Sequence, residues 1–307
     1  MKKIILFLFL VSLLCVPPAL QAKTKKIREG NPEPVVRVYV AGRRHRGIKT
    51  LPLETYLAGV IGNEMSRRWP VEALKAQAVA ARSYALYRME EAHRTGKKFD
   101  VLANQGDQVF RMRDIQNPYL DGIVESTRGE VLWKNGRVVE AFYSSTCGGR
   151  TRSASEAGLS SNSPLKGMCT DSYCRTSPFR NWRAPLTLAE MEKKLHRAGI
   201  KVSNLREVRV KKKEKSGYVR TVELIDDHGR RTMPSRQFRK IMGVMRVKSV
   251  LFDITQTEDG TCVVDGNGFG HGVGLCQYGA KQMAMKGHRY KSILAKYYPK
   301  IPISKIY

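Results

Sequence analysis

The side chain best suited to acid–base chemistry in this sequence is a single carboxylate, Glu64. It follows an apolar stretch, 57–61, and is followed by Met65 and Trp69. Partial burial among such side chains favours the neutral acid and raises the pKa of a carboxyl group toward the range that suits a general acid. The alternative is a structural role, because a single glutamate in such a helix is structural more often than catalytic.

Five cysteines beyond residue 22 form a second group of reactive side chains: Cys147, Cys169, Cys174, Cys262 and Cys276. In an exported protein, thiols are first expected to pair as disulfides, yet an odd number leaves at least one of them free or bound to a metal. Sets of four thiolate and imidazole ligands suit Zn²⁺. Spacing assigns no base to any thiol, which argues against a cysteine nucleophile. Spacing alone does not decide whether these cysteines form disulfides or bind zinc.

A glycine-rich run, 266–274, surrounds His271. Glycines let backbone N–H groups approach an anion, but this run lacks the lysine and serine that end a P-loop and the strand-then-helix context of a dinucleotide fold. We therefore expect a tight backbone path there and no nucleotide site. His271 has four roles open to it: hydrogen bonding to a substrate, orienting a neighbour, binding a metal, or a purely structural contact.

The N-terminus, 1–22, is typical of a secretory signal peptide. Lys2 and Lys3 precede an apolar run, and the small residue Ala22 marks the expected cleavage site. The apolar run is too short to cross a hydrocarbon layer of about 30 Å as a helix. Cys15 could mark a lipoprotein, but the bulky residue before it argues against lipidation. We expect an exported protein of the periplasm or the cell-wall space.

The chain is strongly basic, with a formal net charge of +28. Only two basic residues precede Lys23, so the exported protein keeps a strong positive field and favours polyanionic partners. Nucleic acid is the default partner of such a protein in the cytosol, but export redirects the expectation to wall polymers, anionic lipid or peptidoglycan carboxylates. The alternative explanation of this charge is a generally basic proteome.

The segment 23–34 is predicted to be a flexible basic leader, and folding is expected to start near Val35.

Two helices must position Glu64. The first is predicted from about 54 to 65, with Glu64 near its end, and the second from 71 to 94, between Pro70 and the helix-stopping Gly96. The second helix is rich in alanine, so another element can approach it closely.

Hairpins are predicted around these helices from alternating apolar residues and turn dipeptides. The expected strand segments are 35–40 with 48–53, 130–133 with 137–143 across Asn135-Gly136, and 207–225 across Ser216-Gly217. A short helix around 236–242 should follow the last of these. The sequence thus indicates an α+β fold.

Three blocks carry a resemblance to a known family. The first runs from Leu51-Pro-Leu-Glu-Thr-Tyr-Leu through Glu64-Met to Trp69-Pro-Val-Glu-Ala-Leu-Lys75-Ala-Gln-Ala-Val-Ala-Ala-Arg82. The others are Ala141-Phe-Tyr-Ser-Ser-Thr-Cys-Gly-Gly-Arg-Thr151 and Gly268-Phe-Gly-His271-Gly-Val-Gly-Leu-Cys276-Gln-Tyr278-Gly-Ala280. Together they resemble the stage II sporulation protein D/LytB (amidase enhancer) family, over about residues 35–298.

The resemblance implies a lytic transglycosylase that cleaves peptidoglycan glycan strands between N-acetylmuramic acid and N-acetylglucosamine. Glu64 matches the family's essential glutamate and would act alone, whereas glycoside hydrolases ordinarily need a second carboxylate. Lys75, Arg82, His271 and Tyr278 match positions expected to bind substrate, with a solvated helix face as the alternative for the two basic residues. No cofactor is expected for catalysis, and no nucleic acid partner.

Some relatives bind zinc. The resemblance therefore also implies a structural Zn²⁺ site in this chain. Its expected ligands are Cys147 and Cys276, with Cys169 and Cys174 as further candidates. Because LytB-type relatives are described as amidase enhancers, the competing function is a non-catalytic wall-binding enhancer of an N-acetylmuramoyl-L-alanine amidase, which makes such an amidase an expected partner.

Two further expectations concern the domain plan and one departure from the family pattern. We expect one domain over 35–307, with N-terminal helices packed on antiparallel hairpins. Residues 35–160 and 245–307 form its core and carry the cleft, and 185–245 form a small inserted α/β lobe. Where relatives often carry an aromatic-Gly pair and then Tyr-Leu, this chain has Ala157-Gly158 and Pro164-Leu165, so a cleft tyrosine is expected to be missing.

Overall fold

The computed structural model describes residues 31–41, 46–112, 115–161, 163–167, 169–258 and 260–307. The predicted signal peptide, 1–22, and most of the predicted leader, 23–34, lie outside the described residues. Across the described ranges the fold is α+β, as predicted. No helix in those ranges is both long enough and apolar enough to cross a membrane.

Two consecutive helices and a small sheet form the N-terminal part. Strand β1 (Val35–Val40) pairs antiparallel with β2 (Gly47–Pro52) and parallel with β3 (Val101–Leu102). The helices are α1 (Leu53–Glu64) and α2 (Val71–Arg94), within one residue of the prediction. Six alanines of α2 have no exposed surface, so neighbouring elements contact its backbone closely. Helix α1 packs against α2 and ends at Glu64.

A second part of the same body contains the first predicted turn. Helix α3 (Pro118–Glu125) precedes β4 (Glu130–Lys134) and β5 (Arg137–Val138), and the C-terminal strand β14 (Ile303–Lys305) completes this sheet in the order β14-β4-β5. Asn135 and Gly136 have φ values of 52° and 79°, the left-handed conformation that a type I′ turn requires. The predicted hairpin is therefore confirmed, although β5 is shorter than expected.

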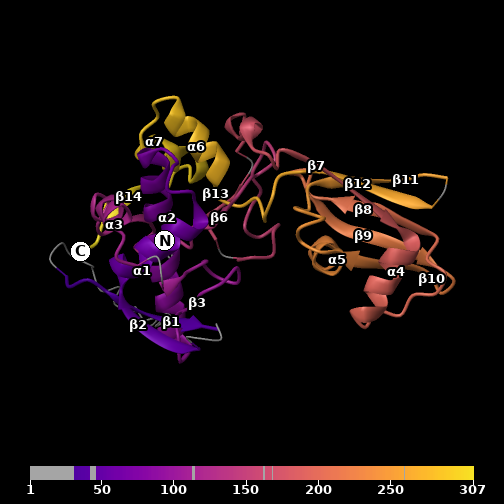
Figure 1. Ribbon diagram of the computed structural model, residues 1–307, viewed down its shortest axis with the longest axis horizontal. Coiled ribbons are helices and arrows are strands. Elements are labelled where there is room, and N and C mark those ends of the chain that lie inside the picture. The colour runs from indigo at the N-terminus through magenta and orange to yellow at the C-terminus, as the bar shows by residue number, and fades with distance from the viewer. Residues whose placement is uncertain (1–30, 42–45, 113–114, 162, 168, 259) are drawn as a thin grey trace, which may run out of the picture.

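Two short parallel strands join distant parts of the sequence. Strand β6 (Tyr143–Ser144) pairs with β13 (Leu275–Cys276), so the second and third sequence blocks lie side by side. The one-turn 3₁₀ helix η2 (Tyr173–Thr176) packs beside helix α6 (Gln277–Met285), which is followed by α7 (Tyr290–Tyr297). Figure 1 shows α6 and α7 next to α2, which places residues 277–297 beside residues 71–94.

The remaining elements form a separate lobe with a hydrophobic core of its own (Figure 1). Its two three-stranded sheets have the orders β10-β9-β8 and β11-β12-β7. The elements in chain order are β7 (Asn181–Thr187), α4 (Leu188–Arg197), β8 (Glu207–Lys213), β9 (Val219–Asp226), β10 (Gly229–Pro234), α5 (Ser235–Met242), β11 (Phe252–Gln256) and β12 (Thr261–Asn267). The hairpin predicted over 207–225 and the helix predicted around 236–242 are both present.

The predicted boundaries of this lobe, 185–245, were too narrow. Strand β12 pairs along its whole length with β7, from Thr261 opposite Thr187 to Asn267 opposite Asn181. Phe252 and Val264 are buried in the lobe's core rather than in the core that carries Glu64. The lobe therefore extends over about 181–267, because β11 and β12 complete its second sheet.

Several buried contacts attach the lobe to the main body. The Tyr218 hydroxyl donates to the carbonyl oxygens of Cys147 at 2.7 Å and Arg150 at 3.1 Å. Arg152 and Glu214 form an ion pair of 2.9 Å with side chains only 2% and 4% exposed. These contacts fix the lobe against the segment that follows β6.

Candidate active site

Glu64 is held at the end of α1 by one contact to each carboxylate oxygen. The backbone N–H of Val109 donates to Oε1 at 2.9 Å, and the side-chain amide of Gln277 donates to Oε2 at 3.3 Å. Helix α1 stops here because Met65 takes an extended conformation, φ −130° and ψ 147°. Gln277, the first residue of α6, faces Glu64 because the β6–β13 pair brings α6 to this point.

Burial raises the pKa of Glu64, and the hydrogen bonds from Val109 and Gln277 lower it in part. Desolvation is the largest of the three effects, so the neutral acid is favoured relative to an exposed glutamate. This is the direction that general-acid chemistry requires, and it agrees with the prediction made from the apolar surroundings.

Beside Glu64 lies a chain of buried hydroxyl and amide groups that the sequence did not reveal. The Tyr56 hydroxyl donates to Gln108 Oε1 at 3.0 Å, and Gln108 Nε2 donates to the Tyr143 hydroxyl at 2.9 Å. Burial, and to a lesser degree the charge of Glu64, raises the pKa of Tyr143 well above its usual value. Tyr143 therefore stays protonated and is a neutral hydrogen-bonding group near the acid.

Aromatic side chains gather beside the end of α1. Trp69 packs edge-on against Tyr278 with ring centroids 4.8 Å apart, and Phe179 packs edge-on against Tyr278 at 6.1 Å. The ammonium group of Lys281 lies 5.3 Å from the Trp69 ring centroid and 5.8 Å from that of Tyr278. The structure thus joins the predicted residue Tyr278 to Trp69 and to two residues that the sequence did not single out, Phe179 and Lys281.

The two basic residues predicted on α2 have different surroundings. Lys75 is partly exposed and pairs with Glu72 at 3.6 Å on the same helix. Arg82 is fully buried and binds both carboxylate oxygens of Glu54, at 2.9 and 2.6 Å, and the carbonyl oxygen of Glu130 at 3.0 Å. Burial and full pairing argue for a structural role of Arg82 and against contact with a bound polymer.

His271 lies on the glycine-rich segment between β12 and β13. Its Nδ1 accepts the backbone N–H of Val273 at 3.1 Å, and its carbonyl oxygen accepts the Arg152 side chain at 2.9 Å. Burial, with smaller effects of nearby arginines including Arg152 and Arg239, lowers the pKa of His271 to about 4. The imidazole is therefore neutral at physiological pH, and its ring packs edge-on against Phe142 with centroids 5.9 Å apart.

His271 predicts an acid-dependent loss of stability. Its pKa falls from an ordinary 6.5 to about 4 in the folded chain, so it stabilises the fold above pH 6.5 and this contribution is lost as the pH falls toward 4. In urea unfolding at several pH values, His271→Asn should flatten the decline between pH 6.5 and 4, because the amide keeps an acceptor but does not titrate. The exposed His228→Asn is the control, and an equal effect of both variants would contradict the assignment.

Three of the four cysteines proposed as metal ligands lie together with an unpredicted carboxylate. The ligand atoms of Cys147, Asp171, Cys174 and Cys276 all lie within 4.8 Å of one another, and all four residues are buried. The neighbouring thiols, that of Cys147 foremost, lower the pKa of Cys174. Cys169 is partly exposed and its thiol contacts the carbonyl oxygen of Thr170, so it is outside this cluster. All five cysteines in the described ranges are free of disulfides.

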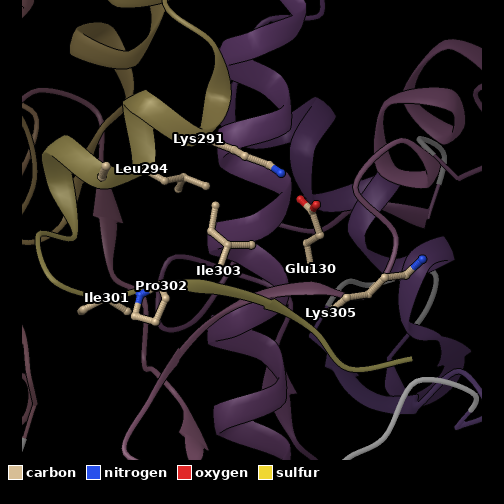
Figure 2. Close-up of a pocket in the computed structure, with 8 residues that line it drawn as sticks. Glu130, Lys291, Leu294, Ile301, Pro302, Ile303 and Lys305 are labelled. Carbon is tan, nitrogen blue, oxygen red and sulfur yellow. The ribbon is translucent and has the colours of Figure 1, made fainter.

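A groove of about 340 Å³ lies between α7 and β14. Figure 2 shows Lys291 extending toward the carboxylate of Glu130, with Leu294 and Ile303 beside them in the lining of the groove. The Glu130 carboxylate accepts the Tyr290 hydroxyl at 2.9 and 3.1 Å. None of the residues that line this groove is a hydrogen-bond partner of Glu64, so we keep the end of α1 as the candidate active site.

Comparison with protein families gives two matches. Residues 42–133 match the family described as stage II sporulation protein, and this range contains Glu64 and both helices that position it. Residues 108–274 match a domain of unknown function, DUF8618, which spans the second block and the lobe.

Individual relatives cover most of the chain. An uncharacterized protein of Brachyspira hyodysenteriae is 34% identical over 83% of this chain and 67% of its own length. Stage II sporulation protein D of Bacillus subtilis is 30% identical over 88% of this chain and 79% of its own length. A protein of Bacillus subtilis named amidase enhancer is 28% identical over 79% of this chain but 39% of its own length. With these matches and this site, the chain belongs to the stage II sporulation protein D family.

Proposed function

We propose that this protein is an exported lytic transglycosylase. Its substrate is the peptidoglycan glycan strand, preferentially a strand whose stem peptides an amidase has removed, and its products carry 1,6-anhydro-muramoyl ends. The observation that supports this most is the position of Glu64, a partly buried acid of raised pKa held at the end of α1 by Val109 and Gln277.

The reaction uses Glu64 twice. Neutral Glu64 donates its proton to the glycosidic oxygen, and the bond from that oxygen to C1 of the muramoyl sugar breaks. The resulting carboxylate takes the proton of the C6 hydroxyl of the same sugar, and that oxygen bonds to C1. The proton is returned and no water is consumed, so one carboxyl group of tuned pKa is enough.

The aromatic surface and the charge of the chain fit a polymeric sugar substrate. The rings of Trp69 and Tyr278 supply apolar faces for sugar C–H groups, and Lys281 beside them supplies a hydrogen-bond donor for hydroxyl or lactyl carboxylate oxygens. The formal net charge of +28 favours association with an anionic cell wall. These features support glycan binding whether or not cleavage follows.

The proposal is tested with purified residues 23–307 and two glycan preparations, one carrying stem peptides and one denuded by an amidase. Mass spectrometry of the soluble products should show 1,6-anhydro ends, with more released from the denuded strands. Intact strands from both preparations, despite measurable binding, would exclude the proposal.

The relative named amidase enhancer supports a second candidate function, a wall-binding protein that stimulates an N-acetylmuramoyl-L-alanine amidase without cleaving glycan. The two functions differ at Glu64. An enhancer should stimulate amidase release of stem peptides equally well before and after the substitution Glu64→Gln, since binding alone is required. The assay is peptide release from intact wall by a purified amidase, with and without each form of this chain.

Gln277 provides a further prediction. Its amide hydrogen bond lowers the pKa of Glu64, so Gln277→Leu should raise that pKa. Because the first step needs neutral Glu64, the pH above which cleavage declines should move upward. The measurement is the pH–rate profile for anhydro-end formation, with Gln282→Leu on the same helix as the control. An unchanged profile for Gln277→Leu, in a variant that remains folded, would show that Gln277 does not tune the acid.

A further inference from the structure

We propose that Cys147, Asp171, Cys174 and Cys276 form a tetrahedral Zn²⁺ site that ties three distant segments of the chain together behind the candidate active site. The four ligand atoms come from the segment after β6, from η2 and the turn that leads into it, and from the last residue of β13. This inference does not depend on the proposed function, since it concerns a metal bound to the folded chain.

The spacing of the ligand atoms fits one metal ion. Zn²⁺ binds thiolate sulfur at about 2.3 Å and carboxylate oxygen at about 2.0 Å, so a tetrahedron has S···S edges of about 3.8 Å and S···O edges of about 3.5 Å. The Sγ atoms of Cys147 and Cys174 are 3.7 Å apart, and Cys147 Sγ lies 3.2 Å from Asp171 Oδ2. The side chains therefore surround a volume of the right size for a metal.

The surroundings of the cluster supply the outer hydrogen bonds that metal-bound thiolates and carboxylates need. Backbone N–H groups of Cys147 and Gly279 donate to Cys276 Sγ at 3.3 and 3.4 Å. The Tyr297 hydroxyl donates to Asp171 Oδ2 at 2.9 Å. Cys276 also caps the N-terminus of α6, where the helix dipole favours negative charge.

A buried carboxylate among three thiols argues for a metal rather than for a disulfide. Asp171 is 1% exposed, and among the ion pairs found in the described ranges none involves it. Burial of a carboxylate without a cation is costly. A disulfide between Cys147 and Cys174 would leave the Asp171 carboxylate without a cation and would leave Cys276 out of the pairing, whereas Zn²⁺ would bind all four groups.

The site is adjacent to the group that contacts Glu64. Cys276 is followed directly by Gln277, whose amide donates to Glu64 Oε2. Fixing Cys276 to Cys147 and Cys174 therefore fixes the start of α6, and with it the position of Gln277. The metal would hold the residues around Glu64 in place from behind, without contact with a substrate.

Metal analysis of purified residues 23–307, dialysed without chelator, tests the site directly. We expect about one zinc per chain, its loss in Cys174→Ser and Cys276→Ser, and its retention in Cys169→Ser and Cys262→Ser. Asp171→Asn should weaken zinc binding, in competition with a chelating dye, by more than the about 10- to 100-fold that loss of an outer-shell partner costs.

If the ligand variants do not fold, the zinc site can still be tested by a measurement on the unmutated chain. After exchange of the metal for Co²⁺, the chain should show thiolate-to-cobalt charge-transfer absorption together with the visible bands of a tetrahedral ion. Absence of zinc and of these bands would overturn the proposal, and so would a mass lower by two hydrogen atoms with a disulfide mapped to Cys147 and Cys174.

Discussion

Glu64→Gln should lower the rate of anhydro-end formation by at least about 100-fold, because a positioned general acid contributes about 10²- to 10⁴-fold. The amide has nearly the same shape, and its oxygen can still accept the N–H of Val109. Its amino group would face Gln277, which can reverse its own amide to accept a hydrogen bond. Fold and glycan binding should therefore survive while the proton for the leaving oxygen is lost.

The matched control for this prediction is Glu90→Gln, which makes the same change at an exposed position of α2. Rates should be measured at saturating denuded glycan, with circular dichroism of each variant as the check on folding. If Glu64→Gln and Glu90→Gln both retain the full rate, Glu64 is not the acid and the account of the site is wrong.

Arg82→Met should lower the free energy of unfolding by about 3–5 kcal/mol, the range found when one partner of a buried ion pair is removed. Arg82 has no exposed surface and binds both oxygens of Glu54, whose side chain is 8% exposed. Methionine fills much of the same volume but leaves that carboxylate in the core without its cation. The measurement is urea unfolding at pH 7, followed by circular dichroism.

The control is Arg94→Met near the end of the same helix, where the pair with Glu91 is exposed and should contribute less than about 1 kcal/mol. The double variant Glu54→Leu with Arg82→Met should be no less stable than Arg82→Met, because neither charge then remains. A stable Arg82→Met chain that no longer binds glycan would show instead that Arg82 contacts the polymer.

The elements that depend on local signals were predictable from the sequence. Pro70 and Gly96 bound α2 closely, and Asn135-Gly136 forms the predicted turn. The outer limit of the lobe was not predictable, because it depends on the pairing of β12 with β7, a strand from a much earlier part of the chain. Alternating residues predict a strand but do not say which core that strand joins.

The same division holds within the candidate site. The apolar stretch before Glu64 was enough to predict the direction of its pKa shift. Its contact with Gln277 was not predictable, since it depends on the parallel pairing of β6 with β13. A lone aspartate such as Asp171 carries no spacing signal, and only the folded chain shows that it replaces Cys169 beside the other thiols. Arg82 was predicted to bind substrate from its position on the helix. The alanines around it in the sequence were a signal that this part of the helix is buried.

The origin of the oxygen in the new chain ends tests the central claim most directly. Denuded glycan should be cleaved by residues 23–307 in water enriched in ¹⁸O, and the products analysed by mass spectrometry. A transglycosylase with Glu64 as its single acid and base should give 1,6-anhydro ends without ¹⁸O, because the C6 hydroxyl of the substrate closes on C1. New ¹⁸O-carrying reducing ends, in excess of those in strands incubated without the protein, would show hydrolysis and contradict the mechanism proposed for this site.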